Sequence, residues 1–228
     1  MKNLEQLDQG LIVSCQALEG EPLHSSFIMG RMAVAAKEGG AVGIRANSVE
    51  DIVEIKKNVD LPVIGIIKKI YGDHDVFITP TMAEIDALMT TGVEIIALDA
   101  TLRKRPDGKN INEFYSEIRE KYPNVLLMAD VSSVQEGEIA DELGFDILAP
   151  TLYGYTEETM GKKIYQDDFQ IIKDLVKTAK KAKVLAEGNV TTPQIARTIM
   201  DLNVHAVVVG GAITRPQLIT RTFVDALK

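Results

Sequence analysis

The chain has 228 residues and a formal net charge of −8 at neutral pH, which argues against a nucleic-acid-binding protein. Its length suits one (β/α)8 barrel, and no Pro/Gly/Ser-rich or charge-biased linker divides residues 1–228 into two domains. No apolar run approaches the roughly 18 residues that cross a membrane, and the first ten residues lack the apolar stretch of a signal peptide.

Short apolar segments rich in Val, Ile and Leu alternate with longer segments of helical spacing, which predicts βα units around a buried parallel sheet. A short helix over 3–9 comes first and could close the bottom of a barrel. The predicted strands cover residues 11–16, 41–45, 62–68, 94–100, 124–130, 145–150, 183–188 and 206–211. The predicted helices cover 26–38, 49–58, 81–91, 111–121, 133–143, 168–181, 192–202 and a segment from about 216. This order predicts an α/β fold, a single (β/α)8 TIM barrel.

Local signals support several of these boundaries. The pair Gly39 and Gly40 stops the first long helix, and either Asn47 or Ser48 can cap the helix over 49–58. The longest loop runs from Thr151 to about Asp167, and loops of this length are usually functional or mobile.

Most of the predicted strands end at a polar residue that an ordinary core would not need. These residues are Gln16, Arg45, Lys68, Asp99, Asp130, Thr151 and Glu187. The C-terminal ends of the strands share one rim in a (β/α)8 barrel, and that rim carries the chemistry. The sequence therefore predicts a single active site there.

Glycine-rich turns follow the last two predicted strands. Gly188 and Asn189 follow the seventh, and Gly210 and Gly211 close the eighth, with Arg215 four residues further on. Glycine lets backbone N–H groups approach an anion, and the loops after strands 7 and 8 of such barrels commonly hold phosphate. We expect a phosphate site here, although the glycines could simply turn the chain and Arg215 could lie on the surface.

A family resemblance extends over most of the chain. The segments that carry it, in order, are VSCQALEGEPLHSSFIMGRMA, GIRANSV, GIIKKIY, ITPTMAEID, IALDATLRKRPDG, LMADVSS, TLYGYT, AEGNVTTP and VVGGAITRP. Together they resemble the N-acetylmannosamine-6-phosphate 2-epimerases. The resemblance implies a cytoplasmic, ribulose-phosphate-binding type of barrel that interconverts N-acetylmannosamine 6-phosphate and N-acetylglucosamine 6-phosphate in sialic-acid catabolism, with no metal and no organic cofactor.

The same resemblance implies roles for individual residues. Lys68 and Glu187 correspond to the acid/base residues, and the companions around the substrate are Gln16, Arg45, Asp130, Thr151 and Tyr155. Gly188, Gly210, Gly211 and Arg215 would bind the phosphate. Asn189 departs from the family, whose members often carry a basic residue at this position, so its contact with phosphate is an open point.

The chemistry can also be argued from the residues. Inverting the carbon next to the aldehyde needs a base, an acid and a group that holds the developing enolate oxygen. Desolvation at the end of an apolar strand should lower the pKa of Lys68, and Glu187 should lie nearly opposite it across the ring. Arg45 could stabilise the enolate charge, and Asp130 could bond sugar hydroxyls or hold Lys68. The alternative is that Lys68 and Glu187 simply form an ion pair.

Other polar residues are weaker candidates. Asp99 is expected to bond the backbone near Thr101, and Lys69 to point outward because successive strand residues alternate. The three histidines, His24, His74 and His205, lack metal-ligand spacing, so no metal site is expected. The lone Cys15 cannot form an intramolecular disulfide, suits a reducing cytoplasm and should be buried.

Two further functions remain open from the sequence. A desolvated Lys68 could instead form a Schiff base, which would make the protein a phosphosugar aldolase. A non-catalytic phosphosugar-binding protein is the third possibility, although it would not need an opposed base and acid. The expected partner is a small phosphosugar, with no nucleic acid and no membrane, and a homodimer is compatible with the sequence.

Overall fold

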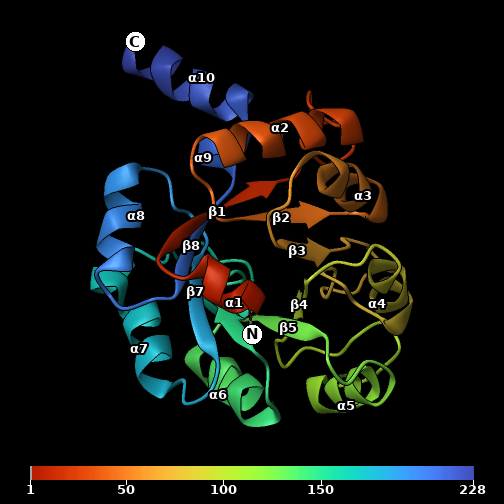
Figure 1. The fold of residues 1–228 in the computed structure, drawn as a ribbon. Coiled ribbons are helices and arrows are strands. Elements are labelled where there is room, and N and C mark those ends of the chain that lie inside the picture. The colour runs from red at the N-terminus through yellow and green to blue at the C-terminus, as the bar shows by residue number, and fades with distance from the viewer. Residues whose placement is uncertain (1) are drawn as a thin grey trace.

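The protein is described by a computed structural model of residues 2–228, in which eight parallel strands close into a barrel in sequential order (Figure 1). The strands are β1 (Gly10–Cys15), β2 (Gly43–Asn47), β3 (Val63–Ile66), β4 (Ile95–Asp99), β5 (Leu126–Asp130), β6 (Ile147–Ala149), β7 (Lys183–Glu187) and β8 (Ala206–Val209). The pairing of β1 with β8 completes the ring. The predicted (β/α)8 TIM barrel is therefore confirmed.

The helices that surround the barrel are α2 (Ser26–Glu38), α3 (Val49–Asn58), α4 (Met82–Met89), α5 (Ile111–Lys121), α6 (Val134–Leu143), α7 (Gln170–Thr178) and α8 (Pro193–Met200) (Figure 1). The others are α1 (Lys2–Leu7) at one end of the barrel, the short α9 (Gly211–Thr214), and α10 (Pro216–Ala226), which extends away from the barrel. As predicted, α1 closes the N-terminal end of the barrel, where Leu7 is buried in one cluster with Ile12 and Ile64. Within residues 2–228, none of the helices has the length and apolarity required to cross a bilayer.

Some element boundaries differ from the prediction. Strand β2 begins at Gly43 and continues to Asn47, and Ser48 rather than Asn47 caps α3 by accepting a hydrogen bond from the Asp51 amide at 3.2 Å. Strand β3 ends at Ile66, earlier than the predicted 68. Beyond Ile66 the chain pairs with a segment outside the barrel sheet, since Lys68 forms an antiparallel bridge with Ile78.

The C-terminal third holds three further differences. The predicted helix 168–181 is shorter, because Asp167, Asp168 and Phe169 all have positive φ and form a separate 3₁₀ turn, Gln166–Phe169, before α7. Strand β8 ends at Val209, and the extra helix α9 was not predicted.

Two apolar layers hold the barrel together. Side chains inside the ring form one cluster, and the outward-facing side chains pack against the helices in a second, larger cluster. Cys15 belongs to the outer layer and is a buried free thiol, as predicted. The closed, apolar interior leaves the C-terminal rim as the place where polar side chains can gather.

Candidate active site

A cavity of about 560 Å³ opens at the C-terminal ends of the strands. The predicted site residues in its wall are Gln16, Arg45, Lys68, Thr151, Tyr155, Glu187, Gly188, Asn189, Gly210, Gly211 and Arg215. Asp130, by contrast, is fully buried behind Arg45 and does not line the cavity. The structure thus brings together residues that lie far apart in the sequence, at the rim where the strand pattern placed them.

Arg45 is the centre of a buried ionic network. Its Nη1 donates to Asp130 Oδ1 at 3.0 Å and its Nη2 donates to Asp130 Oδ2 at 2.6 Å, so the pair is bidentate. The same Nη1 donates to Glu187 Oε2 at 2.5 Å. The Thr151 hydroxyl donates to Asp130 Oδ1 at 2.7 Å. Asp130 therefore bonds Arg45 and Thr151, and among the described residues no hydrogen bond joins it to Lys68.

Lys68 stands apart from this network. Among the ion pairs of residues 2–228, Glu187 pairs with Arg45 and not with Lys68. Burial, together with the positive charge of Arg45, lowers the pKa of Lys68 from 10.5 to about 8, although the Glu187 carboxylate acts in the opposite direction. The simple Lys68–Glu187 ion pair considered above is thus absent from the described part of the chain.

Glu187 has a pKa shifted the other way. Burial raises the pKa of its carboxyl from 4.5 to about 7, and the negative charge of Asp130 adds to this rise while Arg45 opposes it. Its side chain is 14% exposed, at the wall of the cavity. The cavity therefore holds an amine and a carboxyl that both titrate near neutral pH, as acid/base chemistry requires.

Several polar atoms around the cavity have no partner. Of the four buried side-chain N and O atoms without a hydrogen bond in residues 2–228, three belong to cavity residues: Gln16 Oε1, Arg45 Nε and Asn189 Nδ2. Buried polar groups are normally paired, so such atoms mark a place where a polar ligand or water belongs. The Gln16 amide itself is oriented by a hydrogen bond to the Ser14 hydroxyl at 2.9 Å.

Arg215 also lines the cavity and is held by Glu21. Its Nε and Nη2 donate to the two carboxylate oxygens of Glu21 at 2.7 and 3.0 Å. Glu21 was missed by the sequence analysis, since it lies in a loop after β1 with no periodic signal. Arg215 thus binds a carboxylate and also lines the cavity. The sequence offered two alternatives for this residue, a phosphate contact or a place on the surface, and neither includes a carboxylate partner.

Glycines line the same cavity, and one of them lies beside Arg215. Gly210 precedes α9, and a Cβ on Gly211 would lie 3.4 Å from Leu218 Cδ1 and 3.7 Å from Arg215 Cδ. Gly188 has φ +123°, which an L side chain rarely adopts, and Asn189 next to it has φ +52°. The left-handed turn after β7 is therefore a place where glycine is required by the backbone.

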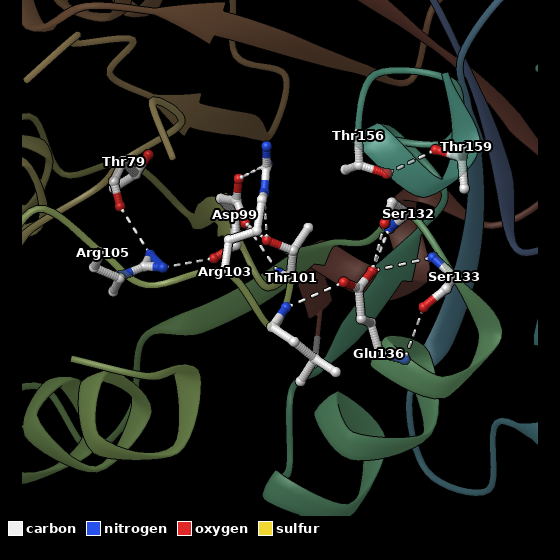
Figure 2. A network of polar contacts seen from close by, with 11 residues as sticks. Thr79, Asp99, Thr101, Arg103, Arg105, Ser132, Ser133, Glu136, Thr156 and Thr159 are labelled. Carbon is white, nitrogen blue, oxygen red and sulfur yellow. Dashed lines mark hydrogen bonds and ion pairs between the residues drawn. The ribbon is translucent and has the colours of Figure 1, made fainter. Parts of the chain in front are cut away.

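Asp99 does not line the cavity and is fully buried. Its carboxylate accepts from the Thr101 amide at 2.9 Å and hydroxyl at 2.7 Å, and Arg103 Nη2 donates to it at 2.7 Å (Figure 2). The predicted contact with Thr101 is confirmed. Lys69 points outward as predicted and pairs with Glu84 at 3.4 Å.

Within residues 2–228, no group of three or more His, Cys, Asp or Glu side chains is arranged to hold a metal ion. His205, at the N-terminal end of the barrel, has its Nε2 2.7 Å from the Leu4 carbonyl. The polar side-chain groups of the cavity wall are an amine, a carboxyl, guanidinium groups, amides and hydroxyls.

A closed barrel with this constellation at its C-terminal rim defines a (β/α)8-barrel enzyme. A family model described as "Putative N-acetylmannosamine-6-phosphate epimerase" matches residues 29–228. The chain belongs to this epimerase family.

Individual relatives agree with the family model. The chain is 57% identical to a putative N-acetylmannosamine-6-phosphate 2-epimerase of Shouchella clausii, with 99% of this chain and 98% of the relative covered. It is 56% identical to one of Borreliella afzelii, with 98% and 97% covered. Among solved structures, the N-acetylmannosamine-6-phosphate 2-epimerase from Clostridium perfringens superposes with a TM-score of 0.91 at 51% identity, covering 98% of this chain and 95% of that one.

Proposed function

We propose that this protein interconverts N-acetylmannosamine 6-phosphate and N-acetylglucosamine 6-phosphate by removing and returning a proton at C2. The observation that carries the proposal is the pair Lys68 and Glu187, whose pKa values of about 8 and about 7 both lie near the working pH in one cavity. Membership of the epimerase family supports the substrate. It also favours epimerisation over the aldolase and the pure binding protein.

Lys68 is proposed as one of the two proton-transfer groups. With a pKa of about 8, roughly a tenth of the amine is neutral at pH 7, against less than a thousandth for an ordinary lysine. The neutral amine can take the C2 proton, and the ammonium form can return one. Because Lys68 has no carboxylate partner within ion-pair distance in the described residues, its nitrogen is free to face a sugar.

Glu187 is proposed to act at the opposite face of the carbon. Arg45 fixes its carboxyl by donating to Oε2, and Asp130 fixes Arg45 by the bidentate pair, so two buried residues orient one reactive group. Arg45 lines the cavity beside Glu187, so its positive charge can stabilise the oxygen on which enolate charge develops. Asp130 is thus a positioning residue in this proposal, whereas Arg45 both positions and stabilises.

The part of the cavity beside Arg215 and Gly211 is proposed to hold the phosphate. Glu21 occupies the Nε side of the Arg215 guanidinium, and Nη1 lies 3.8 Å from where a Cβ on Gly211 would be. This orientation leaves an N–H edge of Arg215 beside the glycine turn, where a phosphate could accept from both. Gly188 and Asn189 supply the facing wall, and Gln16, Thr151 and Tyr155 the polar groups for the sugar between.

The test is an NMR spectrum of N-acetylmannosamine 6-phosphate incubated with the protein in D2O. We expect the signals of N-acetylglucosamine 6-phosphate to appear together with exchange at C2, and Lys68→Met to lose about 10²–10⁴-fold of the rate. A protein that yields neither product nor exchange would refute the proposal. Reduction with borohydride in the presence of substrate should trap no adduct on Lys68, since a Schiff base belongs to the aldolase alternative.

A homodimer is also proposed, through α10. This helix has no buried residue and extends away from the barrel (Figure 1). Phe223 is 70% exposed, and Leu227, directly after the helix, is 88% exposed. The helix borders the cavity through Leu218, Ile219 and Thr222, and Ile219 shares a face with Phe223, so a second copy packed there would also cover the site. Light scattering should give twice the chain mass, and Phe223→Lys should give the mass of a single chain.

The lone thiol Cys15 supports the proposed cytoplasmic location.

A further inference from the structure

A short segment separates β3 from β4 at the rim of the barrel. The two strands pair directly at two positions only, the second of which joins Gly65 to Ile96. Beyond them Lys68 pairs in antiparallel fashion with Ile78, and the Ile78 carbonyl accepts from the amide of the last residue of β4 at 3.0 Å. Residues 77–79 therefore lie between the two strands, and we call them the wedge.

The wedge holds the backbone of Lys68 from one side while β2 holds it from the other. The Lys68 amide donates to Asn47 Oδ1 at 2.8 Å. On the wedge side, the next amide, that of Lys69, donates to a wedge carbonyl at 2.9 Å, and the Thr79 amide donates to the Ile67 carbonyl at 2.8 Å. The residue with the reactive amine is thus fixed at its Cα by partners from two neighbouring segments.

Thr79 joins the wedge to both strands with its side chain. Its hydroxyl donates to the Ala97 carbonyl of β4 at 2.7 Å and accepts from the Ile67 amide at 3.3 Å. The residue is fully buried and has φ +46°, a conformation that is a genuine outlier for a β-branched side chain. Strained residues of this kind persist only where their surroundings over-determine them, and they cluster at functional sites.

Arg105 holds the wedge from the side away from Lys68. Its buried guanidinium donates to the Asp99 carbonyl at 2.8 Å and to the Thr79 carbonyl at 3.2 Å, and its position between the two is seen in Figure 2. It also stacks over the Phe114 ring, 3.9 Å from the centroid. One side chain therefore ties the end of β4 to the strained residue of the wedge.

We propose that Thr79 and Arg105 are positioning residues for Lys68, acting through the wedge to fix where its amine stands in the cavity. The inference rests on the proposed role of Lys68 as a proton-transfer group. Its physical reason is that a displacement of about 1 Å at a reacting group can cost about 10²-fold in rate, while substrate contacts made elsewhere are unaffected. The expected signature is a fall in kcat with little change in KM.

The test compares three single variants. Thr79→Val keeps the β-branched shape, and with it the backbone strain, but removes the hydroxyl; we expect kcat to fall at least tenfold with KM within twofold. Thr79→Ser restores the hydroxyl and should recover kcat to within threefold of the parent. The matched control is Thr91→Val, because the Thr91 hydroxyl also donates to a carbonyl, that of Leu88 at 2.6 Å, and accepts from an amide, that of Val93 at 3.2 Å. It lies in the turn between α4 and β4, away from the cavity, and should leave kcat unchanged.

Outcomes separate this inference from the proposed function. If Lys68→Met abolishes C2 exchange while Thr79→Val retains the parent kcat, or if Thr91→Val loses as much as Thr79→Val, the wedge does not position Lys68. An inactive parent protein would instead refute the proposed function.

A measurement on the parent protein covers the case in which Thr79→Val fails to fold. Hydrogen exchange of the Lys68, Lys69 and Thr79 amides should be as slow as that of the barrel strands. Exchange as fast as at the exposed Gly72 would mean that the wedge is loose and would overturn the inference whatever the activity. Arg105→Lys replaces the two nitrogens that donate to the carbonyls of the wedge and of β4 by one, and it should lower kcat in the same way as Thr79→Val.

Discussion

The depressed pKa of Lys68 predicts that Lys68→Met makes the protein more stable at neutral pH while it destroys activity. Holding a charged amine where its pKa is about 8 instead of 10.5 costs about 1.4 kcal/mol per pKa unit, so about 3 kcal/mol at pH 7 as an upper limit. Lys68 borders an open cavity, and water there reduces the figure to about 1–3 kcal/mol. Methionine fills the same space without a charge. For a chain of this length, the gain corresponds to a rise of about 2–10 °C in Tm.

The pH dependence gives this prediction its sharper form. Because the folded-state pKa of Lys68 lies below the unfolded one, the unfolded chain binds more protons between about pH 8 and 10.5, so the parent protein gains stability as pH rises through this window. The advantage of Lys68→Met should therefore be full at pH 7 and fall by more than half at pH 9.5. Urea unfolding of both proteins at the two pH values measures it. Lys69→Met is the control, since Lys69 is half exposed and paired with Glu84, and it should bring no gain. A destabilised Lys68→Met at pH 7 would refute the desolvation of Lys68.

Two further substitutions test the site itself. Glu187→Gln should strongly lower kcat and leave substrate affinity within a few-fold, because the amide keeps the shape and can still accept from Arg45 but cannot transfer a proton. Calorimetry measures the affinity. If substrate binding is lost together with turnover, Glu187 is mainly an anchoring group. Gly211→Val should lower kcat/KM for the phosphosugar about 10²-fold with a smaller effect on Tm, since the added side chain meets Leu218 and Arg215. Comparable kcat/KM for phosphorylated and unphosphorylated N-acetylmannosamine in the parent would refute the phosphate site.

The sequence predicted the barrel and the wall of the cavity for one physical reason. In a parallel barrel every strand delivers its last residues to the same rim, so Gln16, Arg45, Lys68 and Glu187 could be placed together from strand periodicity alone. Periodicity also placed Cys15 one position earlier, in the buried layer. Such patterns do not show which group each polar side chain bonds, because these partners come together only in the folded structure.

The misses follow from that limit. Glu21 lies in an irregular loop, and only its contact with Arg215 gives it a place at the site. The wedge lies between the predicted strand 62–68 and the predicted helix 81–91. Its pairing with Lys68 is antiparallel and spans ten residues, which no strand or helix period reveals. The three positive φ angles at 167–169 include a phenylalanine, a residue type that gives no signal for this conformation.

The two perturbed pKa values predict how the rate should depend on pH if both groups transfer protons. Below about pH 7 the pair Lys68 and Glu187 carries two protons and offers no base, whereas above about pH 8 it carries none and offers no acid. The active enzyme is the form with one proton on the pair, with the ammonium and carboxylate serving one direction and the amine and carboxylic acid the other. The profile of kcat against pH should then be a bell with its maximum between about 7 and 8, and its two limbs belong to the coupled pair rather than to either residue.

A mechanism with a single base gives a different curve. If Lys68 alone removes and returns the proton, kcat should rise through a single limb and stay high above pH 8. Measurement from pH 6 to 9.5 separates the two. The negative charge of Asp130 raises the pKa of Glu187 and also that of Lys68, so its removal in Asp130→Asn should move both limbs of a bell toward acid pH. A lower limb that stays fixed in Asp130→Asn would exclude Glu187 as the group that titrates there.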